Sequence, residues 1–321
     1  MRLAILGGGR MGRAHLRAAG ERTVAVVEPQ ARIRDELEAR GLRVYAEVED
    51  LLDAGGVDAA IVAAPTTVHR AVVEPLLDAG LPVLCEKPCC IDLHDTRALA
   101  VLAERRGVVL QVGYWRRFVP ELMRLRDDIG SGRLGSLSLV ICQQWDERPP
   151  PASFRRQSGG IAIDMGVHEF DQLRWLTGQE IGCLAAAAST VAVDEPVAGD
   201  PESVQLLASL SGGTVALVSL GRRFPLGDMC RVEVIGTQGF ADRPFLWPPL
   251  GDRVFTEALR AQLDAFETAA AGGERRGATA ADAVQALLAA RRAAEVLRAE
   301  AQAGPRPPPG DSALRSSGSG S

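Results

Sequence analysis

The sequence has few of the features that mark membrane, secreted or nucleic-acid-binding proteins. No apolar run approaches the roughly 18 residues that a membrane-spanning helix requires, and no charged-then-apolar export signal opens the chain. The six cysteines lack disulfide-framework spacing, which fits a reducing compartment, so we expect a cytoplasmic protein. A net charge of −5 gives no general attraction to nucleic acid. Aromatic residues make up only 4% of the chain, which predicts an aliphatic core.

The first 115 residues alternate short apolar runs with amphipathic stretches. Continuously apolar strands that alternate with helices are typical of a parallel sheet covered on both faces. Residues 1–118 are therefore predicted to form a doubly wound α/β domain. The predicted strands are Arg2–Leu6, Thr23–Glu28, Ala59–Ala63, Pro82–Cys85 and Val108–Val112, and the predicted helices are Arg10–Ala19, Ala31–Arg40, Thr67–Ala79 and Asp92–Arg106.

Residues 119–303 are predicted to form a second, α+β domain. Here strands follow one another through turns that contain Gly, Asp and Pro, which favours a largely antiparallel sheet. Residues 304–321 lack apolar periodicity and are predicted to be a disordered tail. The predicted strands are Ser136–Trp145, Ile181–Val193, Val204–Leu210, Thr214–Leu220 and Arg231–Ile235, and helices are predicted over Glu121–Ile129, Arg253–Ala271 and Thr279–Glu300.

A glycine-rich turn follows the first predicted strand and opens the first predicted helix. Gly7, Gly9 and Gly12 form the pattern G-x-G-x-x-G, with Arg10 and Met11 before the last glycine. This strand, turn and helix arrangement is the one that binds a dinucleotide pyrophosphate, because the helix start supplies amides and a partial positive charge. The alternative is an ordinary glycine-rich turn.

An acidic residue ends the second predicted strand, at Glu28, about 20 residues after the first glycine. Its carboxylate can accept hydrogen bonds from ribose hydroxyls and would repel a 2′-phosphate, so NAD(H) is predicted rather than NADP(H). Arg32 lies one helical turn further on and can partly offset this preference. The same arrangement also serves adenosylmethionine-dependent methyltransferases, so the chemistry stays open at this point.

The tripeptide Glu86-Lys87-Pro88 follows a predicted strand, at the sheet edge where doubly wound folds bind ligands. A lysine beside the nicotinamide can hydrogen-bond a substrate hydroxyl and favour its developing negative charge. Glu86 can hold that lysine by an ion pair or through the backbone. The alternative is a surface Glu-Lys pair at a turn.

The stretch Ser158–Gly178 is predicted to be one helix with a reactive face and a buried face. At about 100° per residue, Asp164, His168 and Asp171 fall within one stripe, and Val167 takes the opposite side. The alternative is a capping aspartate and a satisfied core histidine.

Several motifs together resemble the Gfo/Idh/MocA oxidoreductase family, and most closely its inositol 2-dehydrogenase branch. They are Pro65-x-x-x-His69, Glu86-Lys87-Pro88, Gly113-Tyr114-Trp115-Arg116-Arg117-Phe118-x-Pro120 and the block from Ser158 to Leu176. The resemblance covers roughly residues 1–300. It implies a Rossmann domain followed by a domain with an open, mostly antiparallel sheet, often the interface of a homo-oligomer, and a catalytic set of Lys87, Asp164 and His168.

The chemistry of these three residues agrees with alcohol oxidation. His168 is predicted to be the general base, because its imidazole can remove the hydroxyl proton as hydride leaves the carbon. Asp164 is predicted to fix the histidine tautomer or to bind a neighbouring hydroxyl, and Lys87 to stabilise the alkoxide. The predicted function is NAD(H)-dependent oxidation of a cyclic, inositol-like polyol. The alternatives are a sugar or aminocyclitol ketoreductase and a non-catalytic NAD-binding regulatory protein.

Other candidate residues have more than one interpretation. A structural role between domains competes with polyol binding for Arg116 and its neighbour Arg117, and a surface-loop acid is an equal alternative for Asp146. Beyond the catalytic set, the predicted substrate contacts are Tyr114, Arg116 and Asp146, and the predicted cofactor contacts outside the glycine turn and Glu28 are Arg32, Pro65, His69, Glu86 and Lys87.

Two further stretches bear on metal binding and on the oligomer. Cys85, Cys89, Cys90 and His94 match no ordinary zinc pattern, so no metal site is expected. Gly239–Gly251 is rich in proline and aromatic residues and is expected to shorten an edge of the second sheet, which puts a family-like tetramer in doubt.

Overall fold

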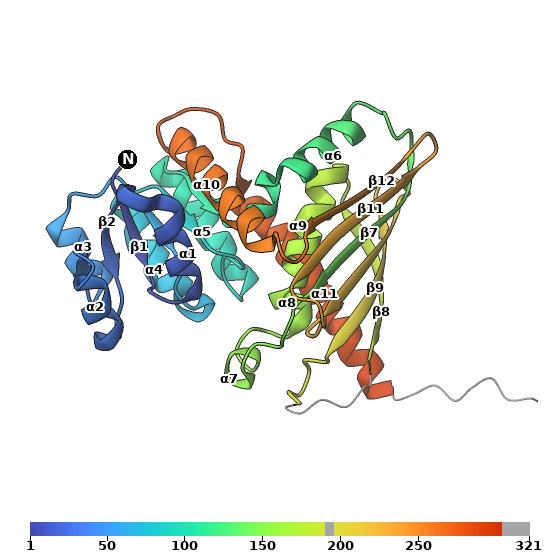
Figure 1. Cartoon of the computed structure of the whole chain (residues 1–321), viewed down its shortest axis with the longest axis horizontal. Helices are drawn as coiled ribbons and strands as arrows, with labels where there is room; N and C mark the ends of the chain where they lie inside the picture. The colour runs from blue at the N-terminus through green and yellow to red at the C-terminus, as the bar shows by residue number, and fades with distance from the viewer. Residues whose placement is uncertain (190–195, 304–321) are drawn as a thin grey trace, which may run out of the picture.

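The computed structural model describes residues 1–189 and 196–303. The predicted tail, 304–321, and the last residues of the predicted strand Ile181–Val193 lie outside the described residues. The chain forms two sheets with helices between and around them (Figure 1). Over the described ranges, no helix combines the length and the apolar character that crossing a membrane requires.

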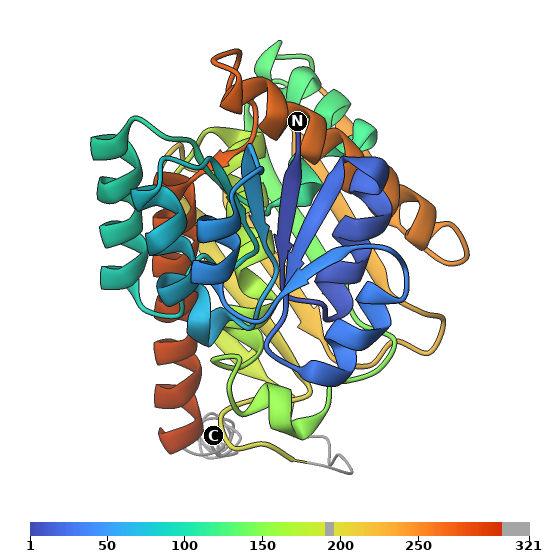
Figure 2. The ribbon, with the colours of Figure 1, turned by 90° about the vertical axis from the view of Figure 1, so that its left-hand side faces the viewer.

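The first sheet has seven strands in the order β13-β6-β5-β4-β1-β2-β3, and helices cover it (Figure 2). Every pairing is parallel except that of β13 with β6. This confirms the predicted doubly wound domain. Its elements are β1 (Leu3–Leu6), α1 (Arg10–Ala19), β2 (Thr23–Val27), α2 (Ala31–Glu38), β3 (Arg43–Tyr45), α3 (Val48–Ala54), β4 (Ala59–Val62), α4 (His69–Asp78), β5 (Val83–Cys85), α5 (Leu93–Arg106) and β6 (Leu110–Val112), with short 3₁₀ turns η1 (Gly20–Arg22), η2 (Thr66–Val68) and η3 (Trp115–Phe118).

The second sheet has six strands in the order β12-β11-β7-β10-β9-β8. Only the pairing of β10 with β7 is parallel, so the predicted mostly antiparallel sheet is confirmed. The elements that follow η3 along the chain, including β13 of the first sheet, are α6 (Pro120–Gly130), β7 (Leu137–Trp145), α7 (Ala152–Arg155), α8 (Ile161–Asp164), α9 (Gly166–Thr177), β8 (Ile181–Ala188), β9 (Ser203–Leu210), β10 (Val215–Gly221), β11 (Met229–Gly236), β12 (Phe240–Leu246), α10 (Gly251–Ala270), β13 (Ala278–Thr279) and α11 (Ala280–Ala303).

The last helices return to the first domain rather than staying in the second. Leu263 and Phe266 of α10 share a buried cluster with Leu3, Ile5 and other residues of the parallel sheet. The two-residue strand β13 adds an antiparallel edge to the same sheet, and α11 packs against both α5 and α9. The predicted boundary at residue 118 lies between η3 and α6, but residues 119–303 are not confined to one domain.

The structure differs from the sequence-based expectation at four places. The short edge strand β3 and the helix α3 were not predicted. The stretch Gly239–Gly251, expected to shorten the sheet, forms the seven-residue edge strand β12, paired with β11. The predicted single helix over Ser158–Gly178 is interrupted at Met165, which separates α8 from α9.

Candidate active site

A cavity of about 1600 Å³ lies between the two domains. It reaches from the glycine turn, across the end of β5, to the start of α9, the end of β7 and the start of β11. Most of the predicted site residues line it: Gly7, Gly9, Arg10, Met11, Glu28, Pro65, His69, Glu86, Lys87, Arg116, Asp146, Asp164 and His168. Gly12, Arg32 and Tyr114 do not, although all three lie in the described part of the chain.

The glycine turn has room for a dinucleotide on one side and none on the other. A Cβ added at Gly12 would lie 1.8 Å from the carbonyl oxygen of Gly7, so only glycine lets the helix approach the turn. Gly7 itself has a φ of +105°. A Cβ at Gly9 would meet nothing within 4 Å, because this residue faces the cavity. The turn therefore fits a phosphate group that approaches the backbone at Gly9.

Glu28 is held at the end of β2 by the backbone of the turn. Its Oε2 accepts a hydrogen bond from the Gly8 amide at 2.7 Å, and its Oε1 accepts one from the Gln30 amide at 2.9 Å. A carboxylate has further lone pairs, so ribose hydroxyls can still donate to it. Arg32 is exposed and lies outside the lining.

Glu86 contacts a buried histidine that the sequence did not single out. The Nε2 of His15, on α1, lies 2.7 Å from Oε1 of Glu86, and both side chains are buried. The other oxygen of Glu86 accepts a long hydrogen bond, 3.3 Å, from the Lys87 amide. Glu86 thus holds Lys87 through the backbone, which is one of the two predicted possibilities.

Lys87 crosses the cavity to the interrupted helix. Its Nζ donates to the backbone carbonyl of Asp164 at 2.8 Å and lies 3.6 Å from Oδ1 of the same residue. In an unbroken helix that carbonyl would accept from the amide of His168. Here the His168 amide donates to Met165 instead, at 3.1 Å. The interruption therefore frees the Asp164 carbonyl to bind the lysine.

The Asp164 carboxylate is shared between two cations. Its Oδ2 accepts from Nη1 of Arg222 at 2.7 Å, and its Oδ1 faces Lys87. Burial opposes its ionisation, but Lys87 and Arg222 outweigh burial and hold the pKa of Asp164 below its usual value. No hydrogen bond joins Asp164 to His168 among the residues described, so this geometry does not support the predicted role in fixing the histidine tautomer.

The imidazole of His168 stands between aromatic rings. Its centroid is 6.1 Å from that of Tyr114 and 6.5 Å from that of Trp115, both edge-to-face. Tyr114 is 1% exposed, so it lies behind the histidine and not at the cavity. Burial and the charges of Lys87, Arg116 and Arg10 hold the pKa of His168 well below its usual value. At neutral pH the ring is therefore uncharged and can accept a proton.

Asp146 lies at the opposite wall, next to Asp228. Met229 pairs with Trp145 across the β7–β11 ladder, which brings the two acids side by side. Burial and the charge of Asp228 raise the pKa of Asp146 to about 6. Both carboxylates line the cavity and are placed to accept hydroxyl hydrogen bonds.

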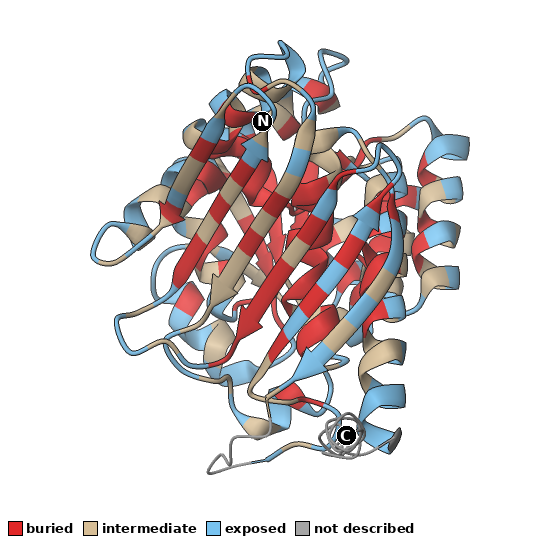
Figure 3. Ribbon diagram, turned by 90° about the vertical axis from the view of Figure 1, so that its right-hand side faces the viewer, coloured by how far each residue is buried: buried red, intermediate tan, exposed pale blue. Residues whose placement is uncertain are grey.

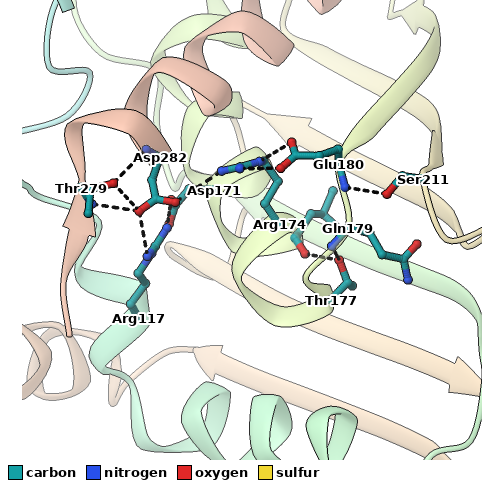
Figure 4. Close-up of polar contacts among 10 residues, drawn as sticks. Arg117, Asp171, Arg174, Thr177, Gln179, Glu180, Ser211, Thr279 and Asp282 are labelled. Atoms are coloured by element: carbon teal, nitrogen blue, oxygen red, sulfur yellow. Dashed lines mark hydrogen bonds and ion pairs between the residues drawn. The ribbon is translucent and has the colours of Figure 1, made fainter. Parts of the chain in front are cut away.

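The two neighbouring arginines of η3 are engaged with α9. Arg116 pairs with Glu169 and donates to Gln144 at 2.7 Å, so its polar atoms are largely occupied by protein although it reaches the cavity wall. Arg117 forms a two-bond fork with Asp171, at 2.6 and 2.9 Å (Figure 4). Asp171 thus faces this arginine and α11, away from the cavity, unlike in the predicted stripe.

His69 and the neighbouring cysteines form a buried cluster. The Nδ1 of His69 lies 3.0 Å from the carbonyl of Cys89 and 3.4 Å from Sγ of Cys85. His94 is far more open, with 82% of its side chain exposed. In the described ranges no group of three or more His, Cys, Asp or Glu is arranged to hold a metal ion.

The site contains residues that sequence patterns did not identify. Arg222 follows β10 and bonds Asp164, His15 holds Glu86, and Asp228 stands beside Asp146. The position of Arg222 directly after a predicted strand was the one sequence feature that could have pointed to it. His15 lies on α1 and gave none, because its partner is 71 residues away in sequence.

Two family models match consecutive parts of the chain. Residues 1–114 match the model "Oxidoreductase family, NAD-binding Rossmann fold", and residues 122–242 match the GFO/IDH/MocA C-terminal domain. The chain is 53% identical to the rhizopine catabolism protein MocA of Rhizobium meliloti, over 92% of this chain and 95% of that protein.

Two further comparisons cover nearly the whole chain. The myo-inositol dehydrogenase Hyg17 of Streptomyces leeuwenhoekii is 38% identical over 92% of this chain and 97% of its own. The crystal structure of a probable dehydrogenase from Thermotoga maritima superimposes with a TM-score of 0.86 at 26% identity, over 93% of this chain and 97% of that one. These matches confirm the resemblance seen in the motifs: the chain belongs to the Gfo/Idh/MocA oxidoreductase family, whose first domain binds NAD.

Proposed function

We propose that this protein oxidises a secondary alcohol of a cyclic, inositol-like polyol with NAD⁺, and reduces the corresponding ketone in reverse. The observation that carries the proposal is the convergence of Lys87, Asp164 and His168 at the cavity that contains the glycine turn. A non-catalytic binding protein has no need of all three. Relatives named for rhizopine catabolism and for myo-inositol oxidation support the substrate class.

The proposed chemistry begins with the proton. An alcohol near its solution pKa is a poor hydride donor, so its hydroxyl proton must leave as the carbon is oxidised. His168 accepts that proton, because its ring is uncharged at neutral pH and has no hydrogen-bond partner in the described part of the chain. In the reverse direction the same ring returns the proton to the ketone oxygen.

The charge that develops on the substrate oxygen meets Lys87. Its ammonium stabilises the alkoxide in oxidation and polarises the carbonyl in reduction. Asp164 keeps the lysine in place through its carbonyl and presents Oδ1 toward a neighbouring hydroxyl. Asp146 and Asp228 supply acceptors on the other wall of the cavity.

NAD⁺, when bound, supplies the hydride acceptor. Gly7, Gly9 and the start of α1 would hold its pyrophosphate, and Glu28 its ribose hydroxyls. The cofactor contacts proposed for Arg10, Met11, Pro65, His69 and Glu86 agree with their places in the lining. Gly12 contributes through close packing.

The decisive experiment is a substrate screen that follows NADH at 340 nm. Purified protein is assayed with NAD⁺ and NADP⁺ against inositol isomers, aldoses and aminocyclitols, with Lys87→Met as the inactive control. We expect turnover of an inositol with NAD⁺. Activity with sugars or aminocyclitols alone would replace the proposal by the ketoreductase alternative, and NADH binding without turnover of any polyol would favour the regulatory one.

We propose further that the protein is a homo-oligomer that associates through the six-stranded sheet. Helices lie on one face of this sheet, whereas in the described ranges none covers the other face (Figure 3). That open face carries exposed Leu207, Val215 and Ile235. Light scattering of the wild type should give a multiple of 34.0 kDa, and Leu207→Glu should lower it. A monomeric wild type would contradict the assembly.

A cytoplasmic location is proposed from the cysteines. All six are free thiols, and Cys183 is exposed. A reducing compartment preserves such thiols.

A further inference from the structure

Arg222 lies at the centre of an ion-pair network directly behind the proposed catalytic residues. It follows β10, where its amide donates to the Glu202 carbonyl at 2.8 Å, and its side chain is fully buried. The guanidinium bridges two carboxylates. Nη1 donates to Oδ2 of Asp164 at 2.7 Å and Nη2 donates to Oδ1 of Asp200 at 3.0 Å. Arg155 pairs with the other oxygen of Asp200 at 3.5 Å.

Asp164 needs such an anchor, because it lies where the helix is interrupted. Its backbone carbonyl has left the helical hydrogen-bond pattern and accepts from Lys87. Its carboxylate could rotate if one oxygen were not fixed. Arg222 fixes Oδ2, which leaves Oδ1 on the side of Lys87 and the cavity.

We propose that Arg222 is a positioning residue for the reaction: it fixes Asp164 so that Asp164 holds Lys87 and presents Oδ1 to a substrate hydroxyl. The inference rests on the proposed function. Arg222 does not line the cavity, so it acts through Asp164, and its charge also lowers the pKa of Asp146. A misplacement of about 1 Å at a catalytic group can lower a rate by about 10²-fold, which sets the scale of the expected effect.

The charged neighbours of Asp164 determine how readily its carboxyl group ionises. Lys87 and Arg222 favour the carboxylate, whereas burial and the negative charge of Asp146 oppose it. His168 lies on the next helix and is uncharged at neutral pH. Removal of Arg222 leaves Lys87 alone against burial, so the pKa of Asp164 should rise.

The test compares Arg222→Met with Arg222→Lys in the full chain with cofactor. The methionine removes the charge and the hydrogen bonds to Asp164 and Asp200, whereas the lysine keeps the charge but lacks the planar guanidinium that bridges the two carboxylates. For Arg222→Met we expect kcat to fall about 10²-fold, NADH affinity to stay nearly unchanged, and the acid limb of the kcat/KM profile to move to higher pH. Arg222→Lys should restore part of kcat and most of the pH profile.

A matched control is Arg117→Lys, which alters a similar buried fork, with Asp171, outside the cavity. It should lower the melting temperature without moving the pH profile. If Arg222→Met does not fold, Arg222→Gln, which removes the charge but keeps a hydrogen-bond donor, takes its place and should shift the profile in the same direction. Wild-type kcat and pH profile in a folded Arg222→Met would overturn the proposal, as would equal losses in both Arg222 variants without any pH shift.

A second readout does not depend on activity. Lys87 is the only lysine in the 321 residues. An amine-selective acylating reagent, followed by peptide mass spectrometry, therefore reports its side chain alone once the N-terminal peptide is separated. We expect Arg222→Met to acylate several-fold faster at Lys87 than wild type, and in Arg117→Lys the peptide that contains Lys87 to acylate at the wild-type rate. Unchanged labelling in Arg222→Met would overturn the positioning role, whereas an inactive wild type with this labelling difference would overturn only the proposed function.

Discussion

Two buried arginine–aspartate pairs lie along the interrupted helix, and they differ in what surrounds them. Asp164 pairs with Arg222 at the end of α8, and Asp171 pairs with Arg117 in the middle of α9. The Asp164 side chain is 14% exposed and lines the cavity, whereas Asp171 is 2% exposed and does not. The two pairs therefore have similar hydrogen-bond distances but lie in different environments.

The pKa values of the two aspartates move in opposite directions. Burial opposes ionisation of both, but Lys87 joins Arg222 beside Asp164, and together they lower its pKa. At Asp171 burial outweighs Arg117, and the neighbouring Asp282 adds a like charge, so its pKa is raised. Lys87 thus favours the ionised form of Asp164, whereas the second pair is a structural contact whose charges are costly to bury.

The largest expected effect lies on the cavity side of α9, at His168. Replacement by alanine removes the proposed proton acceptor, so kcat should fall by about 10²- to 10⁴-fold while NADH binding stays nearly intact. Steady-state assays and NADH fluorescence measure the two quantities. His94→Ala, at an exposed histidine outside the cavity, is the matched control. Wild-type turnover in His168→Ala would remove the assignment of the base.

For the pair of Arg117 and Asp171, the effect of a substitution is expected in the stability of the protein rather than in its activity. Arg117→Met leaves the Asp171 carboxylate buried without its partner, so the free energy of unfolding should fall by about 3–5 kcal/mol. The kcat of the folded protein should stay close to wild type, because neither residue lines the cavity. Urea denaturation and assays of the same samples separate the two.

The double variant Arg117→Met/Asp171→Leu sharpens this test. It removes both buried charges, so much of the lost stability should return. A double variant as unstable as the single one would show that the fork itself, rather than the unpaired charge, carries the stability.

The smallest effect is expected at Asp146, a cavity carboxylate without an ion pair in the described part of the chain. Its raised pKa means that the folded protein binds the proton more tightly than the unfolded chain. Its contribution to stability is therefore lost as the pH rises from about 3.8 to about 6. Asp146→Asn avoids this loss, so its melting temperature relative to wild type should be higher at about pH 7.5 than at about pH 4.5. Glu147→Gln, at the neighbouring exposed acid, should show little such difference.

Local patterns predicted most of the fold. The strands β1, β4 and β5 are continuously apolar and buried at every residue, so their sequences indicate a parallel sheet directly. The edge strand β3 spans three residues, none of them buried, and carries no such pattern. β12 contains a proline, and its exposed and buried residues do not alternate regularly, so propensity argued against it although β11 pairs with it.

The site residues that belong to sequence motifs were predicted, whereas those that join the site through contacts between distant parts of the chain were missed. Lys87 and His168 belong to motifs with a fixed spacing. At the helix interruption the Asp164 carbonyl binds a lysine 77 residues away in sequence, a contact that helical periodicity does not contain, so the periodicity gave a single stripe. Arg222 becomes part of the site only when β10 is placed beside β7 in the sheet.

The helix α10 has a consequence for how the chain is made. Leu263 and Phe266 complete the core on one face of the parallel sheet, whose own strands end at Val112 before β13 is added. A ribosome releases the N-terminal segment first. The cofactor-binding half must therefore wait, with Leu3 and Ile5 uncovered, until the chain has been translated beyond residue 270. Nascent chains arrested at residue 118 should consequently be protease-sensitive, and those arrested well after α10 resistant.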